Sequence, residues 1–347
     1  MKEGVVTLGP KISVREVSVP VPGPEDVLIR VAVTGTNPKD WKMAEWGFGE
    51  RNEGDDMAGV VEKVGTDVVG FRPGDRVGAL HRLRQNYGTF AEFSLAPAHC
   101  VFRLPPKTTF EEAATIPLAA MTAAVGLFAR LRLPQPFSSS TAPREPQPLL
   151  IYGAAGAVGL YTTKLAVHAG FHPLICVAGA GASAVEPWLD SFKGDVIVDY
   201  RKGDQAVVEA IRAAIPEGLS LKHAFDCVSA NGTYLNCEKV LDKGGKLTML
   251  LRIKDHTFRP DLKITDTKVG SVQDDRTYGP RGYKDPDDTE FGRVWFMLFT
   301  QGLKHGWLKG HPYEVIPGGF DGIEQALVKL KSHSASATKF VVRMADI

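Results

Sequence analysis

The sequence predicts an α/β protein with two domains, one a doubly wound parallel sheet and the other rich in β-strands. From residue 149 onward, short apolar runs alternate with helical segments, a rhythm typical of a parallel sheet with helices on both faces. Up to about residue 103, short alternating segments are separated by turns that contain glycine and proline. This second pattern predicts the β-rich domain.

The β-rich domain comes first in the chain. We expect strands at 13–19, 27–33, 58–64 and 76–79. A turn and a short helix are predicted over 34–48, and two helices broken at Pro117 over 110–131. Residues 134–148 are rich in Pro and Ser, so we expect a surface excursion there.

The parallel-sheet pattern then runs in order to about residue 251. Strands are predicted at 149–152, 173–178, 195–199, 223–228 and 246–251, and helices at 158–169, 184–193, 204–214 and 232–241. A long polar loop, 273–290, precedes helices at 291–303 and 320–331. The final strand, 339–344, is expected to return to the first domain.

A glycine motif follows the first strand of the parallel sheet. Gly153, Gly156 and Gly159 lie between an apolar run and a helical segment. Gly153 allows the positive φ of a tight turn, Gly156 leaves the backbone open to a pyrophosphate, and Gly159 lets the helix pack closely on its strand. The alternative is a glycine-rich turn that only closes a βα unit. The strand–turn–helix context favours binding of a dinucleotide at the helix N-terminus.

Composition limits the classes of function. The chain has 347 residues, is 44% hydrophobic and 23% charged, and carries a formal net charge of +1. This balance gives no electrostatic reason to expect nucleic acid or an anionic membrane as partner. No apolar run is long enough to cross a bilayer, and the N-terminus lacks the apolar region of a signal peptide. The four cysteines match neither a disulfide framework nor a metal motif, so a cytoplasmic location is expected.

Several motifs together resemble one superfamily. They are Asn37-Pro38-x-Asp40-Trp41-Lys42, Gly54-Asp55 through Gly59, Gly74-Asp75-Arg76-Val77, Pro117 with Thr122-Ala123, and Gly153 to Gly159. Over almost its full length the chain resembles the medium-chain dehydrogenase/reductase superfamily. Within it, the chain is similar to the zinc-free quinone oxidoreductase branch, and most similar to fungal trans-acting enoyl reductases that work beside polyketide synthases.

The resemblance implies a particular division of the chain. A GroES-like catalytic domain, 1–115 and 291–347, would be interrupted by a Rossmann dinucleotide-binding domain, 116–290. It also implies a nicotinamide coenzyme and an active site in the cleft between the domains.

Zinc-dependent members of the superfamily place a cysteine near Asn37 and a Gly-His-Glu where this chain has Gly54-Asp55-Asp56. Neither Cys nor His is present at these positions. Catalytic zinc needs three well-placed protein ligands, so we expect no zinc. Asp55 and Asp56 could bind another cation, but adjacent carboxylates are more often solvated or paired with Lys and Arg.

The end of the second strand indicates which coenzyme is used. An NAD site usually has an acidic residue there, and none occurs from Phe171 to Val185. Ser183 could donate to a 2′-phosphate, and Tyr200 matches a family tyrosine beside the adenosine phosphate. Arg201 and Lys202 either add positive charge or belong to a solvated turn. We therefore expect NADPH.

The resemblance also supplies candidate site residues, with Lys42 and Thr122 as the catalytic pair. Those expected to bind the coenzyme are Asn37, Asp40, Trp41, Lys42, Thr122, Gly153, Ala155, Gly156, Ala157, Val158, Gly159, Ser183, Tyr200, Leu250 and Leu251. Thr122 either holds the nicotinamide carboxamide or bonds its own helix backbone. Lys42 either donates to the substrate oxygen or the nicotinamide ribose, or is a surface lysine. Asp40 is expected to orient the loop.

Trp46 and Phe48 stand where many quinone reductases have a tyrosine a few residues after the Lys42 motif. We expect both rings to form an apolar pocket wall, which leaves water as the source of the α-proton. The histidines show no partner pattern, so no catalytic role is assigned to His81 or the others.

The predicted reaction is hydride transfer from NADPH to an activated C=C, because an enolate can be stabilised by hydrogen bonds alone. The main hypothesis is a trans-acting enoyl reductase that takes a small-molecule or carrier-protein-bound enoyl substrate and has a polyketide synthase as partner. The alternatives are a stand-alone quinone or alkenal reductase and a non-catalytic NADPH-binding protein. A monomer is expected, because loop 273–290 would obstruct the edge-strand contact of dimeric quinone reductases.

Overall fold

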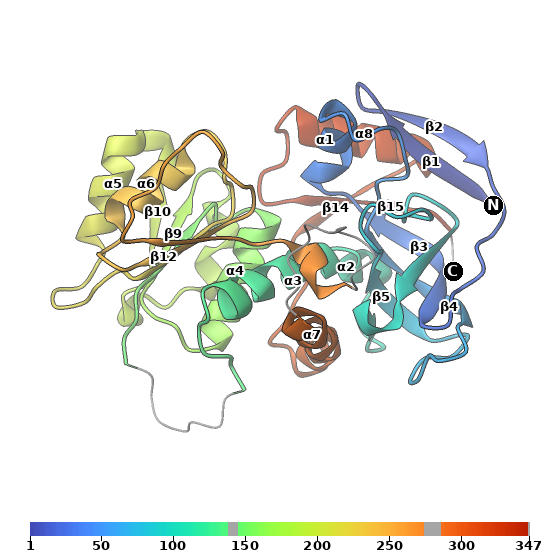
Figure 1. Cartoon of the computed structure of the whole chain (residues 1–347), viewed down its shortest axis with the longest axis horizontal. Coiled ribbons are helices and arrows are strands. Elements are labelled where there is room, and N and C mark those ends of the chain that lie inside the picture. The colour runs from blue at the N-terminus through green and yellow to red at the C-terminus, as the bar shows by residue number, and fades with distance from the viewer. Residues whose placement is uncertain (138–144, 274–285, 346–347) are drawn as a thin grey trace. The chain divides into compact units, whose positions relative to one another are not determined.

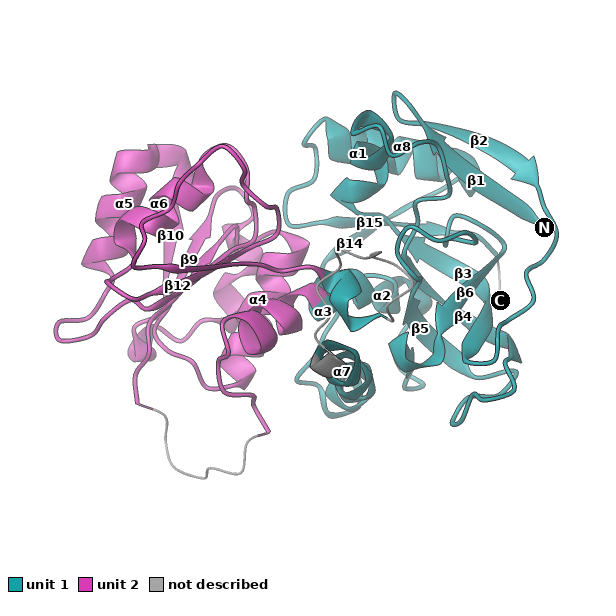
Figure 2. Cartoon of the chain, viewed as in Figure 1, with its two compact units in different colours: residues 1–121, 269–347 teal, residues 122–268 magenta. Residues whose placement is uncertain are grey.

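The computed structural model describes residues 1–137, 145–273 and 286–345 (Figure 1). The chain divides into two compact units, Met1–Met121 with Val269–Ile347 and Thr122–Lys268 (Figure 2). The predicted α/β class, with a β-rich domain and a parallel-sheet domain, is confirmed. In the part of the chain that the structure describes, no helix is both long enough and apolar enough to span a membrane.

The second unit contains a six-stranded parallel sheet in the order β10-β9-β8-β11-β12-β13. Its strands are β8 (Leu149–Tyr152), β9 (Leu174–Ala178), β10 (Val196–Asp199), β11 (His223–Asp226), β12 (Lys246–Met249) and β13 (Lys263–Asp266). Its main helices are α4 (Ala157–His168), α5 (Asp204–Ala213) and α6 (Thr233–Val240). Right-handed crossovers place α4 on one face and α5 and α6 on the other, where these two helices lie side by side in Figure 1.

Strand β8 lies at the point where the strand order reverses. All four of its residues are buried. After β8 the chain adds β9 and β10 on one side, and then crosses back to add β11, β12 and β13 on the other. In doubly wound sheets, ligands bind beyond the carboxyl ends of the strands at such a point. The glycine motif begins immediately after β8, so the fold brings it to this position.

One prediction for the second unit is wrong, and one strand was missed. The expected helix 184–193 is instead three 3₁₀ turns, η3 (Ala182–Ala184), η4 (Glu186–Trp188) and η5 (Ser191–Lys193). Pro187 cannot stand inside an α-helix, and the Asp190 side chain starts a new turn by accepting from Phe192 N at 3.1 Å. Strand β13 was also not predicted, because this edge strand is only half-buried.

The first unit contains a seven-stranded sheet in the order β14-β15-β3-β4-β5-β7, with β6 paired to β3. Its strands are β3 (Asp26–Gly35), β4 (Asp56–Val64), β5 (Arg76–Leu80), β6 (Phe93–Pro97), β7 (Val101–Arg103), β14 (Tyr313–Ile316) and β15 (Lys339–Arg343), and β1 (Lys2–Thr7) and β2 (Lys11–Glu16) form a separate hairpin. Strand β15 pairs antiparallel with β3, which confirms the expected return of the chain to the first domain.

Helices cover this sheet and connect it to the rest of the chain. They are α1 (Pro38–Glu45), α2 (Phe110–Ala113), α7 (Pro286–His305) and α8 (Phe320–Lys331), with short 3₁₀ turns η1 (Ala98–Cys100) and η7 (Val269–Val272). The predicted break at Pro117 is confirmed, because α3 (Pro117–Ala124) starts there and continues into a π-helix, η2 (Val125–Arg130).

The domain boundaries in the structure differ from the expected 115/116 and 290/291. The first boundary falls inside α3, after Met121. The second lies before Val269, because the segment that follows is bonded to the first unit. Gln273 accepts from Leu83 N at 2.9 Å and donates to His81 O at 2.8 Å. Of the predicted loop 273–290, residues 274–285 lie outside the described residues, and α7 begins at Pro286.

We predict that Gly159→Ala destabilises the protein more than Gly156→Ala. A Cβ at Gly159 would overlap the carbonyl oxygen of Gly153 and lie 2.7 Å from Ala154 Cα, whereas one at Gly156 would meet only Gly153 O, at 3.4 Å. Overpacking of this kind costs about 1–3 kcal/mol, and the change at the helix N-cap less than about 1 kcal/mol. Urea unfolding of both variants measures the difference, and equal losses would contradict the packing role of Gly159.

Candidate functional site

The glycine turn after β8 has the geometry of an anion site. Gly153 has φ +77°, and Gly156, the residue before α4, is exposed and offers no side chain to cap the helix. The first N–H groups of a helix have no intrahelical partners and carry its positive dipole end. The conformations expected for Gly153 and Gly159 are therefore confirmed, and the turn fits the pyrophosphate of a dinucleotide. Ala155 is half-buried in the same turn, and Ala157 and Val158 are half-buried at the start of α4.

The carboxyl ends of β9 and β10 lie at the same edge of the sheet as this turn. Tyr200, which follows β10, is 52% exposed, and its ring covers Gly179 so closely that a Cβ at Gly179 would lie 2.5 Å from the ring. Ser183 is exposed on η3, just beyond Gly179. Both predicted coenzyme residues thus lie at the carboxyl edge of the sheet, on the segments that follow β9 and β10.

The two cations after Tyr200 differ in their partners. Arg201 holds Asp199 through Nε at 2.9 Å and Nη2 at 2.6 Å, and these bonds lower the pKa of Asp199 to about 2. Lys202 forms no ion pair within the described residues. Of the two, Lys202 is therefore the cation available to a ligand.

The turn after β11 forms a hydrogen-bonded network. The Asp226 carboxylate accepts from Val228 N and Ser229 N, both at 2.9 Å, and from Thr233 Oγ1 at 2.7 Å. Burial raises the pKa of Asp226 above its usual value. Ser229 Oγ in turn accepts from Leu250 N at 2.8 Å. Asp226 and Ser229 thus fix the turn that precedes α6 and also position the predicted coenzyme residue Leu250.

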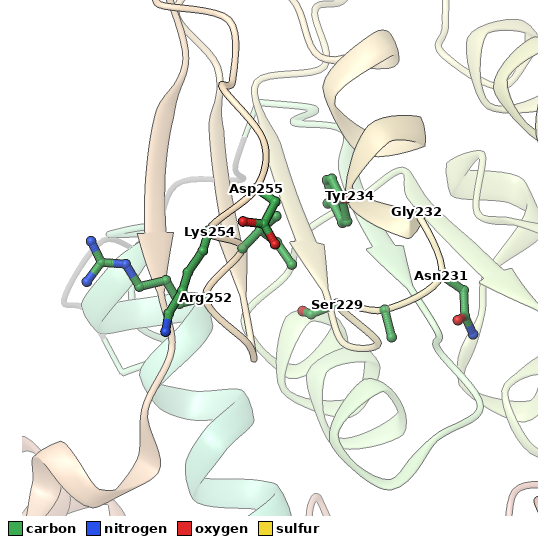
Figure 3. A pocket seen from close by; sticks show the side chains of 9 residues that line it. Ser229, Asn231, Gly232, Tyr234, Arg252, Lys254 and Asp255 are labelled. Atoms are coloured by element: carbon green, nitrogen blue, oxygen red, sulfur yellow. The ribbon is translucent and has the colours of Figure 1, made fainter. Parts of the chain in front are cut away.

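This turn lies against the glycine turn and opens on a pocket. A Cβ at Gly153 would overlap the side chain of Val228, so the two turns are in contact. The pocket has a volume of about 380 Å³ and is lined from two segments (Figure 3). These are Ser229, Ala230, Asn231, Gly232 and Tyr234 after β11, and Arg252, Ile253, Lys254 and Asp255 after β12. Leu250 and Leu251, both half-buried, lead directly into the second segment. A mainly polar pocket thus adjoins the predicted coenzyme residues.

In the first unit, Asn37 begins α1 within a buried polar network. Its Nδ2 donates to Asp56 Oδ2 at 2.8 Å, and its Oδ1 accepts from Lys339 Nζ at 2.9 Å. Lys339 also forms a buried ion pair with Asp56 at 2.6 Å. Asp56 Oδ1 accepts from Leu118 N at 2.6 Å. Both the nitrogen and the oxygen of the Asn37 amide thus bond protein groups.

A second buried network surrounds Lys39. Lys39 Nζ lies 2.9 Å from Asp40 Oδ1, 2.6 Å from Asp55 Oδ2 and 2.6 Å from the Glu53 carbonyl oxygen. The other oxygen of Asp55 is 3.1 Å from His81 Nδ1. Asp40 also accepts from Asn37 N at 2.7 Å, which supports its predicted role in orienting the loop.

The pKa values in this network are shifted by burial and charge together. Burial raises the pKa of Asp40 to about 7, although the nearby Lys39 ammonium opposes the shift. For Lys39, burial favours a lower pKa, but Asp40, Asp55 and Glu53 more than offset it, so its pKa is raised. Lys39 is therefore a permanent cation within a buried group of carboxylates.

These two networks decide between the alternatives for Asp55 and Asp56. Both carboxylates are buried and paired with lysines, so the expected pairing is confirmed, whereas solvation is wrong. Among the described residues, no group of three or more His, Cys, Asp or Glu side chains is arranged to hold a metal ion.

The remaining predicted residues lie on α1, in the loop that follows it, and on α3. The Lys42 ammonium is 5.4 Å from the centroid of the Trp41 ring and 6.0 Å from that of Trp46. Trp46 and Phe48 are half-exposed, so in the first unit they face solvent rather than the core. Thr122 is buried at the start of the second unit.

Sequence reasoning missed Lys39, His81, Asp226 and Ser229. The first two are brought together by long-range packing, and no spacing in the sequence indicates it. Asp226 and Ser229 could have been found, since they follow the strand that neighbours β8 in the usual order of a doubly wound sheet.

Comparison with known proteins identifies clear relatives. Residues 23–106 match the alcohol dehydrogenase GroES-like domain. The chain is 41% identical over 326 residues to the trans-enoyl reductase fsr4 of Gibberella fujikuroi, which covers 93% of this chain and 92% of that protein. It is 31% identical to the trans-enoyl reductase resD of Aspergillus sclerotiorum, with 92% of each chain covered.

Solved structures share the fold. The CurK enoyl reductase matches with a TM-score of 0.75 at 22% identity, covering 99% of each chain. A quinone oxidoreductase from Pseudomonas syringae pv. Tomato matches with a TM-score of 0.72 at 20% identity, again covering 99% of each.

We predict that Asp40 makes the protein less stable as the pH rises toward neutrality. Between pH 3.8 and about pH 7, an unfolded chain has released the proton that folded Asp40 retains, so the free energy of unfolding falls in this window. The limit is about 1.4 kcal/mol per pH unit. The raised pKa of Glu53 acts in the same direction, whereas the lowered pKa of Asp55 acts mainly below pH 3.8, outside this window.

Asp40→Asn removes this titration and keeps an acceptor for Asn37 N. Urea unfolding at about pH 5 and about pH 7 should therefore show the variant gaining stability relative to the wild type at the higher pH. Parallel pH profiles for the two proteins would show that Asp40 does not titrate in this range.

Proposed function

The chain belongs to the trans-enoyl reductase family of the medium-chain dehydrogenase/reductase superfamily, and from this we propose that it reduces the C=C bond of an enoyl thioester with NADPH. The observation that carries the proposal is 41% identity to a trans-enoyl reductase over 93% of the chain. The glycine turn at the reversal of the strand order supports it, because a dinucleotide pyrophosphate fits there.

We propose that the second unit holds the coenzyme along the carboxyl edge of its sheet. The turn from Gly153 to Gly159 would take the pyrophosphate, Ser183, Tyr200 and Lys202 the adenosine end, and Thr122, Leu250 and Leu251 the nicotinamide end. Bound there, NADPH supplies the hydride for the β-carbon of the substrate. Preference for the phosphorylated coenzyme rests on the exposed Lys202, together with the absence of an acidic residue from Phe171 to Val185.

The work of the protein in this reaction is to stabilise the enolate oxygen and to exclude side reactions. We propose that the Lys42 ammonium donates to this oxygen, because its ring contacts hold it in place without using its N–H donors. The α-proton then comes from water. Zinc plays no part in the proposed reaction, since lysines already neutralise the carboxylates of Asp55 and Asp56.

The proposed setting is secondary metabolism, with an enoyl chain carried by a polyketide synthase as substrate. The name of the family, trans-enoyl reductase, supports a separate enzyme that serves such a partner. We further propose a monomer in the cytoplasm.

The proposal predicts oxidation of NADPH when the protein is mixed with enoyl thioesters. Lys42→Ala should lower kcat/KM about 10- to 100-fold, mainly through kcat, because a donor to the developing oxyanion is lost. Lys331→Ala is the control, since Lys331 also lies over the Trp41 ring, at 5.6 Å, but is paired with Glu45. Turnover with quinones alone would favour a quinone reductase, and tight NADPH binding without turnover would favour a non-catalytic protein.

For coenzyme preference, Lys202→Ala should raise KM for NADPH about three- to tenfold and leave KM for NADH unchanged, since only NADPH carries a 2′-phosphate. Lys243→Ala removes the same charge from the exposed turn before β12, at the amino end of the strands, and serves as the control. If both coenzymes are affected equally, Lys202 does not contact the 2′-phosphate.

A further inference from the structure

The loop after α1 exposes two aromatic rings on the surface of the first unit. Trp46 is 50% exposed and Phe48 is 42% exposed. Between and after them, Gly47 and Gly49 have φ +77° and +86°, and a Cβ on either glycine would meet nothing within 4 Å. The loop therefore projects into solvent and presents both rings to it. We call Trp46 and Phe48 the aromatic ledge.

Two cations flank the aromatic ledge. The Lys42 ammonium lies 6.0 Å from the Trp46 ring centroid, and the Arg84 guanidinium carbon lies 4.8 Å from that of Phe48. Within the described residues, neither Lys42 nor Arg84 forms an ion pair. Glu45, at the end of α1, is already paired with Lys331. The exposed Glu50 is the acidic residue of the loop, and the two cations outweigh it.

The Arg51 guanidinium holds the backbone of the aromatic ledge in place. Arg51 donates from Nη1 to Arg84 O at 2.9 Å and from Nη2 to Phe48 O at 3.0 Å, which fastens the two loops together. Its Nε lies 3.3 Å from Glu53 Oε1, in the buried network around Lys39. The backbones of Phe48 and Arg84 are thus positioned before any ligand arrives, which lowers the entropy lost on binding.

We propose that the aromatic ledge binds the phosphopantetheine arm of a carrier-bound substrate, with the phosphodiester against Arg84 and the pantetheine chain along the two rings toward Lys42. This inference rests on the proposed function, since a thioester substrate brings such an arm when it is bound to a carrier protein, as it does when bound to coenzyme A. A guanidinium beside an aromatic ring can bind a phosphate while the ring contacts the attached chain. The carrier, rather than coenzyme A, is the source to which we assign the arm.

The test compares one enoyl group on three thiols: N-acetylcysteamine, pantetheine and 4′-phosphopantetheine. At low salt, kcat/KM for the phosphopantetheine thioester should exceed that for the pantetheine thioester about three- to tenfold, and added salt should reduce this ratio. Arg84→Ala should bring the ratio close to one and leave turnover of the N-acetylcysteamine thioester unchanged. Arg84→Lys should keep part of the ratio.

Two controls make the result specific. Glu50→Gln removes the opposing charge of the same loop and should preserve or raise the ratio. The same enoyl group on a carrier protein should depend on Arg84 at least as strongly as on free phosphopantetheine. Dependence confined to the coenzyme A thioester would overturn the assignment to a carrier.

A ratio of one in the wild type, or a ratio that Arg84→Ala leaves unchanged, would overturn the inference while the proposed reductase activity stands. If no thioester is reduced at all, the proposed function fails, and this inference fails with it.

Discussion

The close contact between α4 and the carbonyl oxygen of Gly153 is the constraint on which the second unit depends. It requires a residue without a side chain at position 159 and leaves Gly156 open in front of the first helical N–H groups. Because β8 is central, the same turn also contacts Val228 after β11, and Gly153 N donates to Val177 O of the neighbouring β9. The anion site is therefore made of backbone N–H groups. The main requirement on the sequence is glycine at the positions where a side chain would block them.

The first unit is organised by the opposite principle, since charged side chains are buried there rather than avoided. Each buried carboxylate near the start of α1 has a lysine within ion-pair distance, which offsets the cost of removing both charges from water. These ion pairs fix the position of the first turn of α1. Asn37 is held by Asp56 and Lys339, and Asp40 accepts from the Asn37 backbone. The helix that carries Lys42 is thereby fixed at its first turn.

The features that the sequence predicted are local ones. The strand at 149–152, the helix at 320–331 and the glycine turn follow from periodicity and from residue types a few positions apart. The helix predicted at 184–193 does not form, because Pro187 and Asp190 favour short 3₁₀ turns and outweigh the apolar pattern of this segment. The buried networks were missed because they join distant residues. Lys339 and Asp56 are 283 positions apart, and His81 and Asp55 are 26 apart.

The contrast between Lys39 and Lys42, one turn apart on α1, shows how surroundings decide the role of a side chain. An ammonium group has three N–H donors, and three oxygens, from Asp40, Asp55 and Glu53, lie within 2.9 Å of Lys39 Nζ. Lys39 has no donor left for a substrate, although its charge is permanent. Lys42 is instead held over the faces of Trp41 and Trp46, which attract its charge without accepting conventional hydrogen bonds from it. Of the two lysines, only Lys42 keeps donors for an oxyanion, and the buried network makes Lys39 part of the support for that helix.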